Sequence, residues 1–317
     1  MAQTIPVIDF SPFFSKNAAA RREVARQMRQ ASQEWGFFYL SGHGMPEETL
    51  ARGFQASRDF FALPDDQKMQ VAWQSASSNR GYVAVRRESL DPTKPGDLKE
   101  AFNAGVESAP TAATDDGSPY TENLWPEGHP GFRRDVTDLL AGCVETANRV
   151  LAAFALALDK PEAFFVDAHD AKDHTLRLLH YPPLPEGFQP ADGESRAGVH
   201  TDYGSITLLF QDDAGGLEVR TRDGRWIAAP PIPGTVVVNT GDLMERWTNH
   251  VFCSTPHRVS VPEEATRKDR YSVAFFCHPN YDHEIRCIDT CTDTDNPPMY
   301  EPITAGDHLM ERLNATY

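Results

Sequence analysis

His200 and Asp202 are the first residues of this sequence whose types and spacing point to metal chemistry. They stand two positions apart in the run 198–210, where β-branched and aromatic side chains dominate and predict a single β-strand. Side chains at positions i and i+2 of a strand point to the same face, so we expect the imidazole and the carboxylate side by side. Such a pair is half of a metal site and calls for a third ligand.

The third ligand is expected among the histidines that follow Asp202 in the chain. His257 comes directly after a proline at the entry to a predicted strand, residues 254–261, where a ligand is held rigidly, whereas His250 falls in a predicted turn. Two histidines and one carboxylate leave positions open on an octahedral metal, which is the arrangement of non-haem Fe(II) oxygenases. A His-x-Asp tripeptide is common by chance, so the assignment needs further support.

Arg270 and Ser272 provide that support at the start of another predicted strand, residues 271–277. They are again two positions apart, so a guanidinium and a hydroxyl are expected on one face. Arginine binds a carboxylate with two parallel hydrogen bonds and serine adds a third donor. A dicarboxylate cosubstrate could chelate the metal at one end and lie in this clamp at the other, although a surface arginine on a sheet edge is the simpler interpretation of the triplet alone.

The elements that position these residues change in kind along the chain. Helices are expected first, and from Thr175 onward short β runs separated by Gly and Pro turns are typical of a jelly roll. One of these turns, Asp223-Gly224, indicates a hairpin. The predicted helices are 18–35, 46–61, 64–70, 132–158, 161–168 and 305–314. The predicted strands are 5–10, 37–40, 98–106, 176–181, 198–210, 217–221, 226–228, 235–239, 254–261 and 271–277. A surface loop at 109–131 and the segment from Tyr281 are expected to border the site.

Composition excludes several classes of partner. A formal net charge of −16 argues against a nucleic-acid partner and against an anionic membrane surface. We expect no apolar run of membrane-spanning length and no signal peptide at the N-terminus. Five cysteines without a CxxC pair favour a reducing, cytoplasmic location. The expected partner is a small molecule, and the oligomeric state stays open.

Taken in order, His200-x-Asp202, His257 and Arg270-x-Ser272 resemble the iron and 2-oxoglutarate motifs of the Fe(II)/2-oxoglutarate-dependent dioxygenases of the isopenicillin N synthase-like family. The runs Ile-Pro-Val-Ile-Asp-Phe and Trp-Gly-Phe-Phe-Tyr-Leu-Ser-Gly-His-Gly near the N-terminus also resemble the opening of that family. The resemblance covers nearly the whole chain. It implies an α+β fold with a double-stranded β-helix (jelly-roll) core, flanked by helices.

The resemblance also implies the cofactors and the division of the chain. Fe(II) would bind His200, Asp202 and His257, and 2-oxoglutarate and O2 would be the cosubstrates. One integrated domain would comprise an N-terminal helical and strand region (1–110), a loop with a long supporting helix (111–174) and the jelly-roll core with a C-terminal helix (175–317). His180 stands where family members often carry a tyrosine that touches 2-oxoglutarate, so it is an expected cosubstrate contact. The alternative interpretation is that His180 is a hydrogen-bonded histidine of the barrel.

Four further residues are expected on the substrate side of the iron. The runs Asn-Arg-Gly-Tyr (79–82), Leu-Arg-Leu-Leu-His-Tyr-Pro (176–182) and Arg-Tyr-Ser-Val-Ala-Phe-Phe-Cys-His-Pro-Asn (270–280), with the stretch 196–212, resemble the fungal thymine 7-hydroxylase branch of the family. That resemblance implies that Tyr203 and Phe276 sandwich a pyrimidine while Asn79 and Arg177 bind its polar edge. Aromatic faces, an amide and a guanidinium suit a flat imide ring.

Other functions stay open at this point. The same chemistry could act on a flavonoid-, hormone- or amino-acid-like metabolite, by hydroxylation, desaturation or ring chemistry. A zinc hydrolase could use the same three ligands, but Arg270-x-Ser272 would then have no role. A metal-free jelly-roll binding protein would have no need of the five motif residues.

Overall fold

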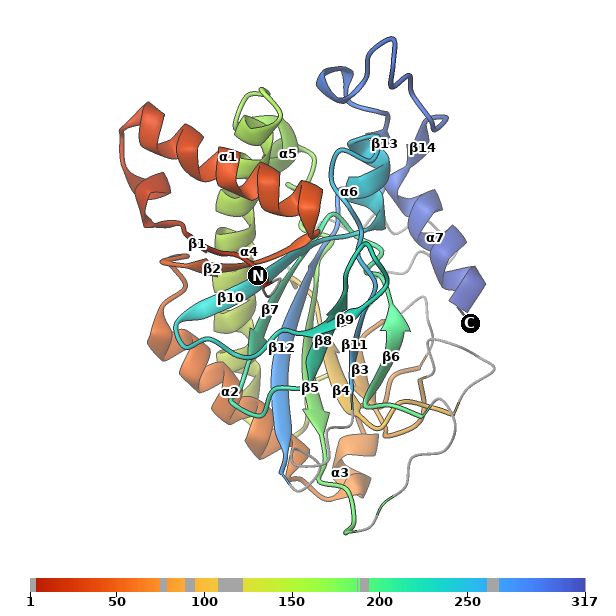
Figure 1. Cartoon of the computed structure of the whole chain (residues 1–317). Helices are drawn as coiled ribbons and strands as arrows, with labels where there is room; N and C mark the ends of the chain where they lie inside the picture. The colour runs from red at the N-terminus through yellow and green to blue at the C-terminus, as the bar shows by residue number, and fades with distance from the viewer. Residues whose placement is uncertain are drawn as a thin grey trace.

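Most strands of this protein form two facing sheets, with most helices on the outer side of the larger one (Figure 1). The computed structural model describes residues 4–74, 79–88, 95–107, 122–186, 188, 194–260 and 268–316. Within them the larger sheet has eight strands in the order β1-β2-β10-β7-β12-β5-β4-β3, and the smaller has four in the order β6-β11-β8-β9. Strands β13 and β14 pair separately.

The bounds of the elements are as follows. The helices are α1 (Ala18–Glu34), α2 (Glu47–Phe61), α3 (Asp65–Met69), α4 (Pro130–Ala157), α5 (Ala163–Asp167), α6 (Asp242–Trp247) and α7 (Ala305–Thr316), with 3-10 turns η1 (Ser11–Phe14) and η3 (Asp289–Cys291). The strands are β1 (Val7–Asp9), β2 (Phe37–Ser41), β3 (Gly81–Val83), β4 (Glu100–Ala104), β5 (Thr175–Tyr181), β6 (Ala197–His200), β7 (Ile206–Gln211), β8 (Leu217–Arg220), β9 (Trp226–Ala228), β10 (Thr235–Thr240), β11 (His257–Val259), β12 (Arg270–Cys277), β13 (Glu284–Ile285) and β14 (Ile303–Thr304).

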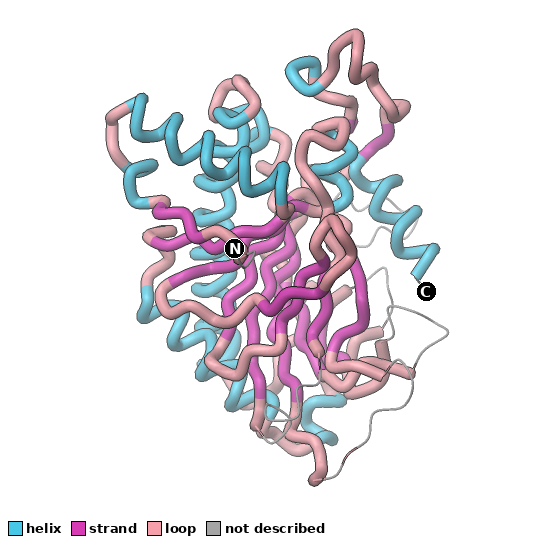
Figure 2. The backbone as a smooth tube through the Cα atoms, viewed as in Figure 1, coloured by secondary structure: helices cyan, strands magenta, loops and turns pink. Residues whose placement is uncertain are grey.

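The main hydrophobic core lies between the large sheet and the helices. α4 packs against α1, α2 and α5, and Figure 2 shows these helices gathered along one side of the strands. Alternate residues of a strand face opposite ways, so Val273 and Phe275 of β12 point into this core. Strands β1 to β4, from the first 104 residues, belong to the same sheet as β5, β7, β10 and β12, so both halves of the chain support the site.

Helix α4 corrects one expectation about apolar runs. It is long and apolar enough, by length and composition, to cross a membrane, whereas no such run was expected from the sequence. In this structure 61% of its most apolar window is buried, and residues such as Val136, Leu139 and Phe154 lie in the main core. Its apolar character is therefore used in packing against the sheet and its neighbouring helices.

The site lies between the two sheets. Two smaller apolar clusters join them, one around Tyr39, Val219 and Val237 and the other around Leu179 and Val259. A cavity between these clusters is lined by residues of both sheets, among them the β12 residues that face away from the main core. Those residues are Arg270, Ser272, Ala274 and Phe276. The arrangement confirms the predicted jelly-roll class.

The run 198–210 is not one strand, which corrects the sequence prediction. β6 ends at His200 in the small sheet and β7 begins at Ile206 in the large one, so the chain crosses between sheets at this point. The crossing is tight. The backbone N–H of Ser205 donates to the carbonyl of Cys277 at 2.9 Å, and a Cβ on Gly204 would lie 2.7 Å from that oxygen. These contacts across the fold override local β propensity.

Other predicted elements are confirmed with shifted ends. Asp223-Gly224 turns between β8 and β9, and Gly224 has a φ of +83°, which favours glycine. Asn17 begins α1 by accepting hydrogen bonds from the N–H groups of Ala19 (3.0 Å) and Ala20 (3.3 Å). In the predicted loop 109–131, residues 109–121 lie outside the described part of the chain, and α4 already begins at Pro130.

Candidate metal centre and active site

His200 and His257 face each other across two neighbouring antiparallel strands. His200 ends β6 and His257 begins β11, and the two residues are direct partners in the strand pairing. Their ring centroids are 4.2 Å apart. Each Nδ1 bonds a backbone carbonyl, that of Gly198 at 2.8 Å for His200 and that of Thr255 at 3.1 Å for His257. Because a carbonyl only accepts, Nδ1 carries the proton in both rings and both Nε2 lone pairs are left for a metal.

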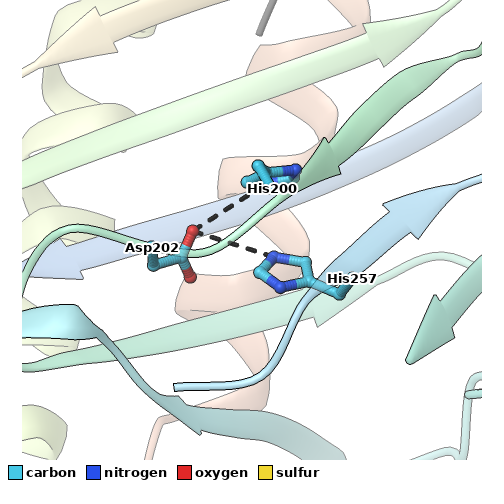
Figure 3. Close-up of side chains that lie close together, drawn as sticks. All are labelled: His200, Asp202 and His257. Atoms are coloured by element: carbon cyan, nitrogen blue, oxygen red, sulfur yellow. Dashed lines mark ion pairs between the residues drawn. The ribbon is translucent and has the colours of Figure 1, made fainter. Parts of the chain in front are cut away.

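Asp202 completes the cluster from the crossing between β6 and β7. Its Oδ1 lies 3.8 Å from Nε2 of His200 and 3.7 Å from Nε2 of His257 (Figure 3). Its Oδ2 accepts hydrogen bonds from Thr207 (2.6 Å) and Asn239 (2.7 Å). One carboxylate oxygen is thus held by the protein while the other points at the two imidazoles. The ligand atoms of the three residues lie within 4.8 Å of one another, so one ion could bind all three.

Electrostatics keep His200 and Asp202 in the protonation states that a metal requires. Burial, with the neighbouring His257, lowers the pKa of His200, so its imidazole is neutral near pH 7. Burial acts to raise the pKa of Asp202, but the two imidazoles and the hydrogen bonds from Thr207 and Asn239 outweigh it and hold that pKa below its usual range. Two imidazoles and one carboxylate are the donor set of a non-haem Fe(II) centre with open positions.

Arg270 lies at the same cavity, and within the described chain its guanidinium donates hydrogen bonds to neutral groups. The side chain is 1% exposed, and its Nε donates to the carbonyl of Gly215 at 2.6 Å. Its Nη2 donates to Oε1 of Gln211 at 3.1 Å and its Nη1 to Oγ of Ser272 at 3.2 Å. The guanidinium also lies 4.6 Å from the ring centre of Tyr181. A buried guanidinium with such neutral partners is a site for a carboxylate.

His180 does not belong to this site, which corrects the expectation that it contacts the cosubstrate. On β5, Arg177, Leu179 and Tyr181 line the cavity, and His180 has the opposite parity. Its Nδ1 bonds Glu100 at 2.7 Å and its Nε2 bonds Asp269 at 2.7 Å. Its ring stacks on Tyr271, whose centroid is 4.5 Å away. Both nitrogens are therefore occupied on the far face of the sheet.

All four residues expected to bind substrate line the same cavity as the metal cluster: Asn79, Arg177, Tyr203 and Phe276. Asn79 has a φ of +40° and its Oδ1 accepts a hydrogen bond from Asn103 at 2.8 Å, which fixes the orientation of its amide. His250, the weaker candidate for a metal ligand, lies elsewhere and bonds the hydroxyl of Tyr300 at 2.6 Å.

Sequence reasoning missed several polar residues of the cavity wall. Glu88 pairs with Arg177 and lies 3.6 Å from Nζ of Lys99, which also pairs with Asp97. Burial acts to raise the pKa of Glu88, but the charges of Arg177 and Lys99 outweigh it and lower that pKa. No local sequence pattern predicts these ion pairs, because 89 residues separate Glu88 from Arg177. His278 had a signal, since it continues the parity of Phe276 two residues beyond.

Comparison with known proteins covers most of the chain. A family described as the N-terminal region of non-haem dioxygenases in morphine synthesis matches residues 5–128, and the 2OG-Fe(II) oxygenase superfamily matches residues 172–279. The 2-oxoglutarate-Fe(II) type oxidoreductase hxnY of Emericella nidulans is 36% identical over 100% of this chain and 92% of its own. A homoarginine-6-hydroxylase of Oryza sativa is 32% identical over 98% of this chain and 97% of its own.

A solved structure shows the same fold with ligands bound. The crystal structure of full-length thymine 7-hydroxylase of Neurospora crassa, in complex with alpha-KG and thymine, superposes with a TM-score of 0.88 at 37% identity, covering 99% of this chain and 97% of that one. The same protein has also been solved with alpha-KG and 5-formyluracil.

Proposed function

This chain belongs to the 2OG-Fe(II) oxygenase superfamily, and from that premise we propose that it hydroxylates a small planar heterocycle, a pyrimidine such as thymine. It is a 2-oxoglutarate-dependent dioxygenase that uses Fe(II) and O2. One observation carries the proposal: the metal cluster, the Arg270 clamp and the pair Tyr203 and Phe276 all line one cavity.

The proposed iron ligands are His200, Asp202 and His257, and the residues present fit that ion. Their donor atoms converge, the histidine tautomers are fixed and the carboxylate is ionised. Bound Fe(II) and 2-oxoglutarate supply the oxidation of a C–H bond by O2, with release of succinate and CO2. The chain's own contribution is to hold the ligands in place through Gly198, Thr255, Thr207 and Asn239, and to bury Asp202 and His257 within the fold.

Arg270 and Ser272 are the proposed partners of the distal carboxylate of 2-oxoglutarate. The guanidinium already donates to Gly215, Gln211 and Ser272, which holds its plane in one orientation. A carboxylate arriving there would supply a negative charge to a guanidinium whose hydrogen bonds go to neutral groups. The ring of Tyr181, whose centre lies 4.6 Å from the guanidinium carbon, adds a cation–π contact.

Tyr203, Phe276, Asn79 and Arg177 are the proposed substrate contacts. Two aromatic side chains suit a flat ring, and an amide and a guanidinium suit its carbonyl and N–H groups. The thymine complex of the Neurospora crassa enzyme supports a pyrimidine, because that protein is 37% identical to this one over nearly the whole chain.

Succinate release tests the proposal when it is measured with Fe(II), 2-oxoglutarate and O2 against thymine, L-homoarginine and L-proline. We expect thymine to raise succinate release above the substrate-free level, with equimolar hydroxylated thymine detected by mass spectrometry. Stimulation by L-homoarginine or L-proline alone would reject the pyrimidine and keep the reaction class.

We also propose that the protein works in the cytoplasm. All five cysteines are free, and Cys143, Cys277 and Cys291 are buried as thiols. Fractionation of source cells should recover the protein with cytosolic markers, and recovery in a secreted fraction would refute this location.

A further inference from the structure

Helix α7 forms one wall of the active-site cavity. Ala305, His308, Leu309 and Met310 line it together with the metal cluster. The helix is tied to the site by Arg312, which pairs with Asp242 and lies 5.7 Å from the ring centre of Tyr203. The C-terminal segment therefore belongs to the substrate pocket.

His308 is an unusual residue on this wall. It is 7% exposed, and neither ring nitrogen has a hydrogen-bond partner among the described residues. The other buried histidines of the described chain each use at least one ring nitrogen: His43, His169, His174, His180 and His257. Buried polar groups in native proteins are paired, so an orphaned imidazole at a cavity wall indicates a ligand partner.

His278 lies close to His308 and lines the same cavity. Its backbone N–H donates to Nδ1 of His174 at 3.2 Å, and its ring lies against Gly204, where a Cβ would come within 2.9 Å of its Nδ1. Burial lowers the pKa of His278 to about 4, and burial with the charge of Arg246 lowers that of His308. Asp242, Glu311 and Arg312 are the other charged groups that act on His308.

The charged residues of the cavity wall indicate the charge of the substrate. Among the described residues, three cations line the cavity outside the Arg270 clamp, and each has an acidic neighbour: Arg177 with Glu88, Lys99 with Asp97 and Arg80 with Asp173. A carboxylate substrate would find no uncompensated cation among these three. Each neutral imidazole offers a donor and an acceptor nitrogen, which suits the N–H and C=O groups of an uncharged ring.

We infer that His308 and His278 bind a second polar edge of the substrate, in addition to the edge taken by Asn79 and Arg177, and that the substrate is a neutral cyclic amide or imide. This inference rests on the proposed reaction class and narrows its substrate. His308 is a specificity-determining residue on α7. Removing its hydrogen bond to the substrate weakens substrate binding and leaves the binding of iron and 2-oxoglutarate unchanged.

The variants His308→Leu and His308→Gln test this, with His250→Leu as a matched control for an imidazole outside the cavity. Succinate release would be titrated with thymine, uracil, 2-pyridone, L-proline and L-homoarginine. We expect His308→Leu to raise the KM of the stimulating amide about 10-fold, with substrate-free 2-oxoglutarate turnover unchanged. His308→Gln, which keeps a donor and an acceptor, should recover the KM to within about threefold, and His250→Leu should match the wild type.

The outcomes separate the inference from the proposed function. Stimulation by thymine with an unchanged KM in His308→Leu overturns the inference alone, as does equal damage in the Leu and Gln variants with a lowered Tm. If uracil or 2-pyridone stimulates succinate release and thymine does not, and the KM for the stimulating compound rises in His308→Leu, thymine is rejected as the substrate and the inference is supported. Stimulation by none of the neutral amides overturns both.

Discussion

His257 lies directly opposite His200 in the pairing of β11 with β6, so backbone register fixes the separation of the two imidazoles. Both rings are then oriented by a carbonyl two residues earlier in their own chain segment, Gly198 for His200 and Thr255 for His257. The cluster is thus preorganised before any metal arrives. Only Asp202 depends on distant side chains for its orientation.

That dependence predicts a role for Asn239 in metal affinity. Asn239→Ala removes one of the two hydrogen bonds to Oδ2 of Asp202, so the carboxylate should lose its fixed orientation. We expect Fe(II) affinity to fall by about 10- to 100-fold, measured by anaerobic titration. Asp202→Ala should abolish tight binding. An unchanged affinity in Asn239→Ala would show that Thr207 alone holds the carboxylate.

Arg270→Lys should raise the KM for 2-oxoglutarate by about 10- to 100-fold, because a point charge does not reproduce the two parallel hydrogen bonds of the guanidinium. Steady-state succinate release at saturating Fe(II) measures this. Arg258→Lys is the matched control, since Arg258 pairs with Glu218 and does not line the cavity. A KM that does not move in Arg270→Lys would reject the clamp.

Tyr203→Ala should separate substrate binding from cosubstrate turnover. Loss of an aromatic face should raise the KM for the substrate about 10-fold, while 2-oxoglutarate is still consumed without substrate. The ratio of hydroxylated product to succinate should fall, because the substrate is no longer held against the metal. If Tyr203→Ala loses substrate hydroxylation and 2-oxoglutarate consumption together, Tyr203 instead helps to hold the metal ligands in place.

His180→Phe tests the correction made to the cosubstrate site. It should leave the KM for 2-oxoglutarate unchanged, since His180 faces away from the cavity. Its loss leaves Oε1 of buried Glu100 without the donor at 2.7 Å, at a cost of about 1–3 kcal/mol in the free energy of unfolding. Thermal unfolding should therefore show a Tm several degrees below wild type, whereas His129→Phe, at the start of α4, should not. A raised KM for 2-oxoglutarate in His180→Phe would show that His180 contributes to the cosubstrate site.

The sequence was sufficient for the parts of the site that depend on motif and parity. His200, Asp202, His257, Arg270 and Ser272 are all brought to one cavity, and their types and spacing, with the family resemblance, indicated the chemistry. Of the two interpretations of His180, the structure supports the hydrogen-bonded histidine, and strand parity already set it on the face opposite Arg177, Leu179 and Tyr181.

The remaining differences come from contacts between distant segments. The break of the predicted strand at 201–205 depends on the carbonyl of Cys277, which lies in another strand far along the chain, and no local propensity encodes it. Glu88 and His308 reach the cavity only when their segments pack against the sheets. The sequence shows that such residues are polar, but the tertiary fold determines which residues they contact.

Anaerobic addition of Fe(II) and then 2-oxoglutarate to the purified protein tests the central claim most directly. A visible charge-transfer absorption band should appear only when both are present, because 2-oxoglutarate then chelates iron held by His200, Asp202 and His257. The band should be absent in Asp202→Ala and should need more 2-oxoglutarate in Arg270→Lys. No band in the wild type, with no tightly bound iron, would contradict the assignment of this site.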